Sequence, residues 1–289
     1  MRNESGPRAR GRRAPGSPAS VQPVNAAFSA ALASVDGEIM LASRATIPAT
    51  DEGLLRGDGI FEVIRVYEGT PFAFDEHLRR LERSAANTRL PLDVEAVRAD
   101  ANRLLAHAGG GPDHELLRIV ITRAGRRLLL TEPLPAAPER IRLGTITYSP
   151  TRVLDGVKSL SYGANMLASR LARERGFDEA LLVTPHGRVL EAPTSSIFWV
   201  TGGTVLTPPL DDHILASITR AAVIELTRAQ EQPCTLEDLF AADEAFLTST
   251  TREVQPIAAV DTHEFPRERP ITEQAAANLH AHIHAELAS

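Results

Sequence analysis

Two pairs of short apolar runs, each closed by a glycine-containing turn, constrain the second half of this chain more than any other feature. The first pair, 179–184 and 188–192, flanks Pro185-His186-Gly187. The second pair, 196–201 and 204–208, flanks Gly202-Gly203. Turns of this kind join antiparallel neighbours. The sequence therefore predicts a second half that is built on β-hairpins.

The first half combines hairpin and helix patterns. Asp36-Gly37 and Glu68-Gly69 are typical hairpin turns, and the segment 60–67 alternates in polarity as a strand does. A helix over 75–90 is expected to begin with Asp75 as N-cap, and a second over 93–109 to end at Gly109. Further strands are expected within 115–125 and 140–149. The first half is therefore expected to be α+β with an antiparallel sheet.

A chain of 289 residues with 43% hydrophobic residues is long enough for two compact domains. We expect an Arg/Pro/Gly-rich disordered tail over 1–23 and a small N-terminal domain over 24–147. A Ser-Pro and an Asp-Gly break indicate a linker at 148–156. The larger C-terminal domain then covers 157–289. The predicted fold class is α+β, with two domains.

Composition excludes several functions. A net charge of −6 and a pI of about 5.9 argue against nucleic-acid binding, and no apolar run is long enough to span a membrane. The single cysteine, Cys234, rules out an intramolecular disulfide and fits a cytoplasmic location. His186 and the C-terminal histidines form no preorganised ligand set, so no metal site is expected.

Lys158 stands out because nearly all of the 31 Lys+Arg residues are arginine. A buried lysine can lose its proton and act as a nucleophile, which arginine cannot do. Glu191 on a returning strand and a Ser/Thr helix start at 217–219 follow it. An amine, an acid and a helix N-terminus together suit pyridoxal 5'-phosphate (PLP), which carries an aldehyde, a ring nitrogen and a phosphate. From the residues alone, a surface lysine, a solvated glutamate and a plain helix cap remain alternatives.

Several segments in order resemble one family between about residues 50 and 260. These are "LLRGDGIFEVIRVYEG", "DEHLRRLERSA", "VKSLSYGANMLASRLA", "GRVLEAPTSSIF", "TPPLDDHILASITRAAVI" and "FLTSTTREVQPI". They are similar to the motifs of the class IV aminotransferases, which are PLP enzymes of fold type IV. The resemblance implies a small N-terminal α/β domain and a larger C-terminal domain with a β-barrel-like core and flanking helices.

The resemblance also implies roles for individual residues. Lys158 would be the Schiff-base lysine and proton shuttle, Glu191 the partner of the ring nitrogen, and Tyr162 a neighbour of the cofactor oxygen. Ser217 departs from a common glycine of the family, although both residues are small. The residues that would hold the phosphate, here called the phosphate cup, are Arg80, Ile218, Thr219, Thr250 and Thr251.

The resemblance implies amino acid and 2-oxo acid substrates and a homodimer. "FEVIRVY" is most similar to the D-amino acid group, whereas Val63 departs from both the branched-chain enzymes and the aminodeoxychorismate lyases. We expect a D-amino acid transaminase with (R)-amine side activity. A branched-chain L-amino acid aminotransferase is the alternative, a lyase is less favoured, and the joint presence of Lys158, Glu191 and Arg80 argues against a binding module without turnover.

Substrate contacts are expected from Phe61 and from a loop whose arginines could bind a carboxylate in a bidentate manner. Those arginines are Arg123, Arg126 and Arg127. Solvated loop charges without a binding role are the alternative for these three residues.

Overall fold

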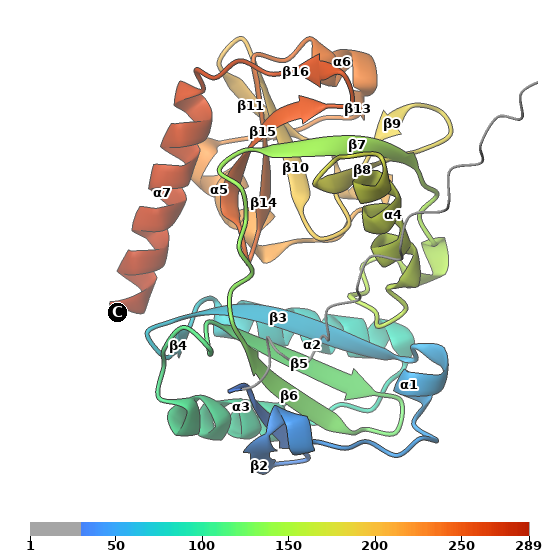
Figure 1. Ribbon diagram of the computed structural model, residues 1–289, viewed down its shortest axis with the longest axis vertical. Helices are drawn as coiled ribbons and strands as arrows, with labels where there is room; N and C mark the ends of the chain where they lie inside the picture. The colour runs from blue at the N-terminus through green and yellow to red at the C-terminus, as the bar shows by residue number, and fades with distance from the viewer. Residues whose placement is uncertain (1–29, 289) are drawn as a thin grey trace, which may run out of the picture.

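The computed structural model describes residues 30–288, and the predicted tail at 1–23 lies outside this range. Two sheets form the centres of two domains, with a single extended crossover between them (Figure 1). One sheet has six strands and the other has ten. The prediction of a two-domain α+β fold is confirmed.

The small domain has an antiparallel sheet in the order β2-β1-β6-β5-β3-β4. Its strands are β1 (Leu32–Val35), β2 (Glu38–Leu41), β3 (Gly59–Tyr67), β4 (Thr70–Pro71), β5 (Leu116–Thr122) and β6 (Arg127–Glu132). Its helices are η2 (Ala42–Arg44), α1 (Glu52–Arg56), α2 (Phe74–Thr88) and α3 (Val94–Ala108). Both predicted hairpins are present, because β1 pairs with β2 and β3 pairs with β4.

Alternation along β3 decides which side chains can reach the large domain. Ile60 and Ile64 pack into one buried cluster with Leu78 and Leu81 of α2. Since successive strand residues point to opposite faces, the odd-numbered residues from Phe61 to Tyr67 lie on the face away from α2. That face is directed toward the large domain.

The large domain has a mixed sheet in the order β12-β11-β10-β14-β15-β7-β8-β9-β13, with β16 paired to β15. Its strands are β7 (Ile141–Thr147), β8 (Glu179–Val183), β9 (Arg188–Val189), β10 (Ser196–Thr201), β11 (Thr204–Thr207), β12 (Gln230–Glu231), β13 (Cys234–Thr235), β14 (Glu244–Ser249), β15 (Glu253–Val260) and β16 (His263–Glu264). Its helices are η3 (Arg152–Leu154), α4 (Gly163–Glu174), η4 (Leu210–Asp212), α5 (Ile218–Thr227), α6 (Leu236–Phe240) and α7 (Pro270–Leu287). The expected hairpins β8/β9 and β10/β11 both form.

The crossover between the two sheets differs from the linker expected at 148–156. β7 runs parallel to β8 and β15 in the large sheet, so the chain changes domain at residues 133–140. This segment contains Pro133, Pro135 and Pro138, which cannot donate to a ladder of hydrogen bonds. Residues 148–156 form a local loop that leads from β7 to Lys158.

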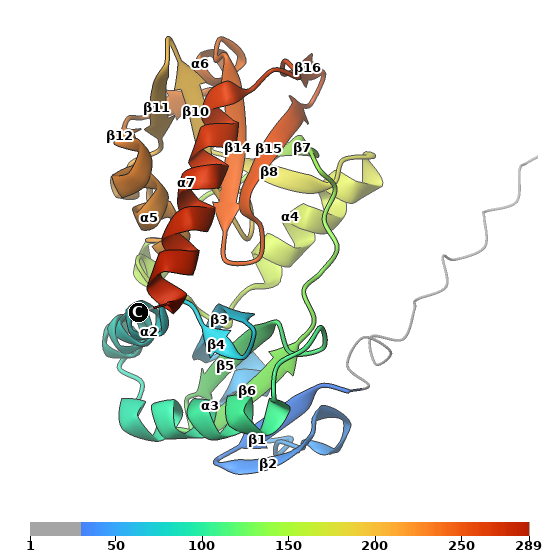
Figure 2. The ribbon, with the colours of Figure 1, turned by 90° about the vertical axis from the view of Figure 1, so that its left-hand side faces the viewer.

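Helix α7 joins the two domains a second time. It packs against β14, β15 and α5, and its C-terminal end reaches the start of α2 (Figure 2). The amide of Ala73, the N-cap of α2, donates to Glu286 Oε1 at 3.0 Å. The predicted N-cap, Asp75, lies one residue inside the helix instead. The carboxylate that caps α2 therefore comes from the far end of the chain, which a local pattern cannot reveal.

Neither a membrane span nor a metal centre emerges from residues 30–288. No helix in this range is long and apolar enough to cross a membrane. The same range holds no group of three or more His, Cys, Asp or Glu side chains that could bind a metal ion.

Candidate active site

Lys158 lies on an extended segment that pairs with the beginning of β3. The Phe61 amide donates to the Lys158 carbonyl at 3.0 Å, and the Lys158 amide donates to Ser84 Oγ on α2 at 3.2 Å. A Cβ atom at Gly59 would lie 2.5 Å from the Ile121 carbonyl oxygen and 2.6 Å from a Leu160 methyl carbon. Glycine is therefore required where the segment crosses β3.

Aromatic and cationic side chains surround the lysine amine. Lys158 Nζ lies 4.3 Å from the ring centroid of Phe61, and the guanidinium carbon of Arg118 lies 5.9 Å from the same centroid. The Tyr162 ring packs edge-on against Phe61, with 5.3 Å between centroids. The two domains thus meet at Phe61, which contacts the amine directly.

Burial, together with the charges of Arg80 and Arg118, lowers the pKa of Lys158 to about 8, against the opposing effects of Glu62 and Glu191. Desolvation disfavours the charged form of an amine, and a nearby cation acts in the same direction. Lys158 consequently reaches its neutral, nucleophilic form at a much lower pH than a free lysine does.

Glu191 follows β9, and its carboxylate accepts from the Leu215 amide at 3.3 and 3.4 Å. Burial raises the pKa of Glu191 to about 8, against the opposing effects of the Leu215 amide, Lys158 and Arg220. A buried carboxyl with one weak donor has spare capacity for a cationic partner. A protonated ring nitrogen meets that requirement.

Tyr162 is the residue immediately before α4, and it forms a hydrogen bond to the segment that follows Glu191. Its hydroxyl donates to the Pro193 carbonyl, which also accepts from Asn165 Nδ2 at 3.1 Å. Burial raises the pKa of Tyr162, so the phenol remains a donor at neutral pH. This contact holds the segment after Glu191 against α4.

Arg80 reaches across the domain boundary from α2. Its Nε and Nη2 atoms donate to Glu62 at 2.7 and 2.6 Å, and Nη1 donates to the Ala216 carbonyl at 3.1 Å. His77 Nδ1 lies 2.8 Å from the same carboxylate. The network is almost completely buried. It points one edge of the guanidinium toward the start of α5.

The start of α5 presents free amides beside Arg80. Ser217 is the N-cap and its Oγ accepts from the Arg220 amide at 3.2 Å. Among the described residues, no acceptor binds the amides of Ile218 and Thr219. A helix N-terminus with free N–H groups and an adjacent arginine suits a phosphate.

Thr250 and Thr251 lie on the turn between β14 and β15. Thr250 and Thr219 line one small pocket at the domain boundary, together with Ser249, Tyr67 and Glu253. The structure thus brings Ile218, Thr219 and Thr250 of the expected phosphate cup to one pocket, whereas Thr251 lines a different pocket. The amine, the carboxyl and this cup fit the three functional groups of PLP.

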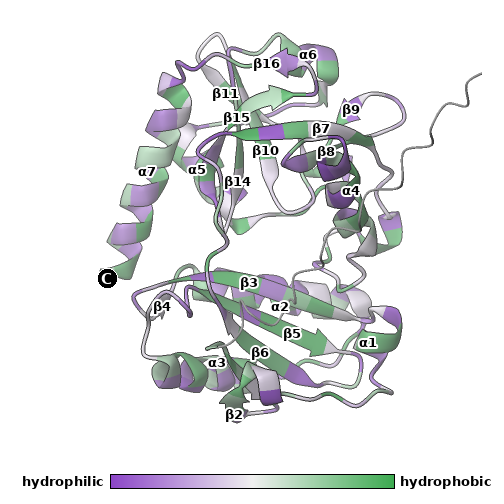
Figure 3. Cartoon of the chain, viewed as in Figure 1, coloured by the Kyte–Doolittle hydropathy of each residue, from purple (hydrophilic) through white to green (hydrophobic). Residues whose placement is uncertain are grey.

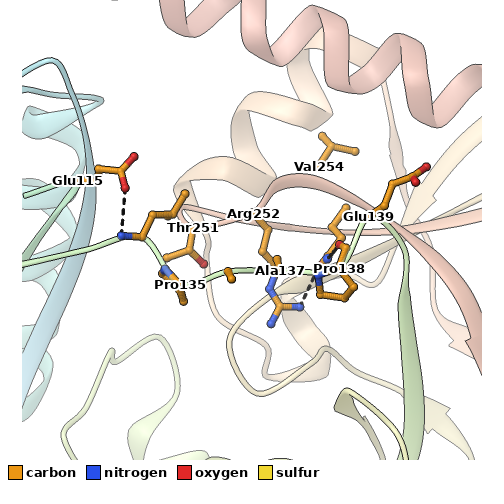
Figure 4. Close-up of a pocket in the computed structure, with 11 residues that line it drawn as sticks. Glu115, Pro135, Ala137, Pro138, Glu139, Thr251, Arg252 and Val254 are labelled. Atoms are coloured by element: carbon orange, nitrogen blue, oxygen red, sulfur yellow. Dashed lines mark hydrogen bonds between the residues drawn. The ribbon is translucent and has the colours of Figure 1, made fainter. Parts of the chain in front are cut away.

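A larger pocket, with a volume of about 410 Å³, opens beside the crossover (Figure 4). Thr251 and Arg252 line it from the β14/β15 turn, and Glu115 and residues 134–139 line it from the other side. Gln255 Nε2 donates to the Pro138 carbonyl at 2.6 Å. This pocket excludes Lys158 and Glu191, so it is an open space next to the site and does not contain the reacting groups.

Arg123 is held within the small domain. Its Nε and Nη2 atoms each donate to Asp58 at 2.9 Å. It also donates to the carbonyls of Arg89 and Thr88, at 2.7 and 2.9 Å. Four internal acceptors therefore use most of its hydrogen-bonding capacity.

Arg126 and Arg127 also have acidic partners within the small domain. Arg126 Nη1 donates to Asp36 at 2.8 Å and its Nε lies 3.5 Å from Asp51, whereas Arg127 Nε donates to Asp100 at 2.8 Å. The structure does not bring the three loop arginines together with Lys158 in this chain.

Arg118 and Glu62 are the site residues that sequence reasoning missed. Arg118 pairs with Val63 across β3 and β5, so it lies on the face that carries Phe61. Glu62 is fully buried on the opposite face. The available signal was a charge inside each otherwise apolar strand: Glu62 in "GIFEVIRV", which also holds Arg65, and Arg118 in "LLRIVIT".

Comparisons with known proteins identify the family of this chain. The model for the family "Amino-transferase class IV" matches residues 59–260. A Methanocaldococcus jannaschii protein provisionally named branched-chain-amino-acid aminotransferase is 33% identical over 252 residues, covering 78% of this chain and 87% of its own. D-alanine aminotransferase of Bacillus licheniformis is 29% identical, covering 78% and 87%. A bifunctional aminodeoxychorismate lyase and D-amino acid transaminase of Mycobacterium tuberculosis is 29% identical, covering 83% and 94%.

Solved structures give the same result. A fold IV-transaminase from Curtobacterium pusillum superposes with a TM-score of 0.78 at 30% identity, covering 89% of this chain and 99% of its own. A hypothetical aminotransferase from Mycobacterium tuberculosis, in a form with alpha-ketoglutarate and PMP, superposes with a TM-score of 0.81 at 26% identity, covering 88% and 99%. The same protein is also known in a PLP-bound form. The expected type IV fold is confirmed.

Proposed function

The chain belongs to the class IV aminotransferase family, and we propose that within this family it is a transaminase of D-amino acids. The protein is a PLP-dependent transaminase. Its relatives divide among D-alanine aminotransferases, branched-chain aminotransferases and aminodeoxychorismate lyases. The choice of substrate therefore rests on this chain's own residues.

Lys158 carries the proposed chemistry. PLP supplies, when bound, an aldehyde that reacts with amines and a protonated ring that accepts electrons. Lys158 provides the amine that binds the aldehyde and, once displaced by substrate, moves a proton at the substrate Cα. Glu191 holds the proton on the ring nitrogen. Arg80, with the amides at the start of α5 and the turn 250–251, holds the phosphate.

The position of Arg118 is the single observation that supports a substrate with a carboxylate. It contacts the face of Phe61 near Lys158, and a third of its side chain is exposed. Its Nε and Nη2 atoms both donate to Glu132, at 2.5 and 2.9 Å, so only the edge formed by Nη1 and Nη2 is available to a second carboxylate. Arginine is well suited to bind a carboxylate through two parallel hydrogen bonds. A simple amine would not require this residue.

The D configuration is proposed from the "FEVIRVY" strand and from relatives named as D-alanine aminotransferases. We further propose (R)-amines as side substrates, because Val63, Val120, Leu128 and Leu130 give the same sheet face an apolar character. The branched-chain L-amino acids are the second candidate, favoured by the M. jannaschii relative.

The experiment is a half-reaction on purified, PLP-loaded protein, followed by absorbance. D-alanine and D-glutamate are expected to convert the cofactor to its amine form, and L-leucine is expected to leave it unchanged. Conversion by L-leucine alone would support the branched-chain alternative. Turnover without any 2-oxo acid acceptor, with ammonia or pyruvate released, would support a lyase.

A homodimer is proposed from an exposed apolar surface. Leu54 and Leu55 of α1, Val153 of η3 and Leu167 of α4 are between 49% and 86% exposed. α1 and α4 lie on the same side of the molecule, and part of α1 has hydrophobic colour (Figures 1 and 3). Exposed apolar residues that gather on one side indicate an interface. Light scattering is expected to give twice the mass of the chain, and Leu54→Glu is expected to reduce it.

A cytoplasmic location is proposed on the basis of Cys234. Among the described residues it is a buried free thiol. Free thiols persist in reducing compartments. Fractionation of the native host, with the protein detected by antibody, tests this proposal.

A further inference from the structure

Tyr67, at the end of β3, connects the small domain to the turn that carries Thr250 and Thr251. Its hydroxyl donates to Glu253 Oε1 at 2.8 Å. Glu253 is the first residue of β15, directly after that turn. A small-domain side chain therefore contacts the base of the turn in the large domain.

Glu253 has an unusual backbone conformation for its residue type. Its φ angle is +55°, in the left-handed region that favours glycine. The turn before it is closed by the Arg252 amide, which donates to the Ser249 carbonyl at 3.2 Å. A non-glycine residue persists in such a conformation only when its surroundings hold it there. The bond from Tyr67 is an interaction that holds this side chain.

Tyr67 is itself rigidly placed. Its ring packs edge-on against Phe72, with 6.4 Å between centroids, and the Arg65 guanidinium lies 5.2 Å from its centroid. Phe72 belongs to a buried cluster of the large domain that includes Leu279 and Ile283 of α7. The phenol is therefore a donor with a fixed position, anchored in both domains.

The same small pocket is lined by Tyr67, Glu253, Thr219 and Thr250. Two of these residues belong to the proposed phosphate cup, and the other two form the hydrogen bond that links the domains. The Tyr67–Glu253 bond therefore lies directly beside Thr219 and Thr250 of the cup.

We propose that Tyr67 is a positioning residue for the cofactor phosphate, because through Glu253 it holds the turn 250–252 in the conformation that presents Thr250 and Thr251. The inference deepens the proposed function and rests on the proposed phosphate cup. It assigns to the small domain a second role in cofactor binding, in addition to Arg80, and it couples the docking of the two domains to phosphate binding.

The test compares PLP with pyridoxal, which lacks the phosphate, by equilibrium dialysis against the full-length protein. Tyr67→Phe is expected to weaken PLP binding about 3- to 10-fold, the scale of one hydrogen bond to a charged group or somewhat less, with pyridoxal binding unchanged. An equal loss for both ligands, or no loss for either, would overturn the proposal. Glu253→Gln, which weakens the acceptor and keeps its size, is expected to fall between wild type and Tyr67→Phe.

The Glu253→Gly variant shows whether Tyr67 affects PLP affinity through residue 253 or through a general effect on stability. Glycine adopts a φ of +55° without help, so the turn no longer depends on the phenol. In a Glu253→Gly background, Tyr67→Phe is therefore expected to cause no further loss of PLP affinity, as a double-mutant cycle measures. Additive losses would mean that Tyr67 acts elsewhere.

Thr250→Ala separates failure of this inference from failure of the cup itself. It is expected to weaken PLP and not pyridoxal, since it removes a group proposed to contact the phosphate. If Thr250→Ala has this effect and Tyr67→Phe does not, the cup stands and the inference falls. If Thr250→Ala has no effect either, the assignment of the turn to the phosphate is wrong. Hydrogen exchange of the PLP-loaded protein is expected to speed up at 250–253 in Tyr67→Phe and to stay unchanged in α3.

Discussion

Lys158 Nζ lies 4.3 Å from the ring centroid of Phe61, and Lys158 is the only lysine in the sequence. Phe61 comes from the small domain, so the position of the amine depends on both domains. Because no other side chain supplies a primary amine, Lys158 is the one side chain in this protein that can form an imine with an aldehyde.

Replacement of Lys158 is expected to abolish covalent capture of PLP. Lys158→Arg keeps a cation over Phe61, so the fold should survive, but a guanidinium does not bond to the aldehyde. Borohydride reduction followed by peptide mass spectrometry is expected to find one pyridoxyl group at residue 158 in the wild type. Neither Lys158→Arg nor Lys158→Ala should carry the group on any internal peptide. A label on another internal residue would contradict the assignment.

The reactivity of Lys158 is expected to rise with a midpoint near pH 8 in the cofactor-free protein. Burial and the Arg80 charge lower its pKa to about 8 from the ordinary value of 10.5, so the neutral amine forms early. The unfolded chain keeps its proton up to about pH 10.5, so between pH 8 and 10.5 it binds more protons than the folded protein does. The free energy of unfolding therefore rises with pH over this range. Labelling the single lysine with an amine reagent across pH measures the midpoint. Arg80→Gln is expected to raise it, and an unchanged midpoint would mean that Arg80 does not influence the amine.

Local patterns predicted the elements well, because hairpins and helix caps depend on neighbouring residues. The turns at Gly202-Gly203 and Asp36-Gly37 and the N-cap Ser217 all formed as expected. Local signals did not predict the domain boundary. β7 belongs to the large domain because it pairs with β8 and β15, and such pairing is not visible in a local pattern. A proline-rich crossover and a loop with an Asp-Gly turn look alike in one sequence.

The motif residues of the site could be located from the sequence, but their partners could not. Arg123 resembles a free loop arginine until the structure places Asp58 next to it. Arg118 acquires a place in the site only because β5 pairs with β3 in one register, which puts it on the face of Phe61. Both relations join residues more than 50 positions apart, where periodicity carries no information.

Removal of the Ser217 cap is expected to destabilise α5. Ser217→Ala removes the acceptor for the Arg220 amide and should lower the free energy of unfolding by about 1 kcal/mol. Ser217→Gly, the matched control, should cost only a few tenths of a kcal/mol. Urea titration measures both values. An unchanged free energy of unfolding in Ser217→Ala would show that the hydroxyl does not act as a cap.

Glu191→Gln is expected to slow the half-reaction at least about 100-fold, a typical loss when a group that stabilises developing charge is removed. The amide cannot keep a proton on the ring nitrogen, whereas the phosphate cup and Lys158 remain. PLP should therefore still bind and still be captured at residue 158. Stopped-flow absorbance measures the rate, and a variant with the wild-type rate would separate Glu191 from the chemistry.

Arg118 and Arg123 offer a matched pair of arginines, one on the Phe61 face and one held by Asp58. Arg118→Gln is expected to raise the KM for amino acids about 10- to 100-fold, the value of a charged hydrogen bond, and to leave a simple (R)-amine unaffected. Arg123→Gln is expected to leave both KM values unchanged. It should lower stability by no more than about 1 kcal/mol, because Arg123 is a third exposed and solvent screens its bond to Asp58. Steady-state kinetics on both substrates decides between them: a raised KM in Arg123→Gln alone would assign the carboxylate to the loop and remove Arg118 from the substrate site.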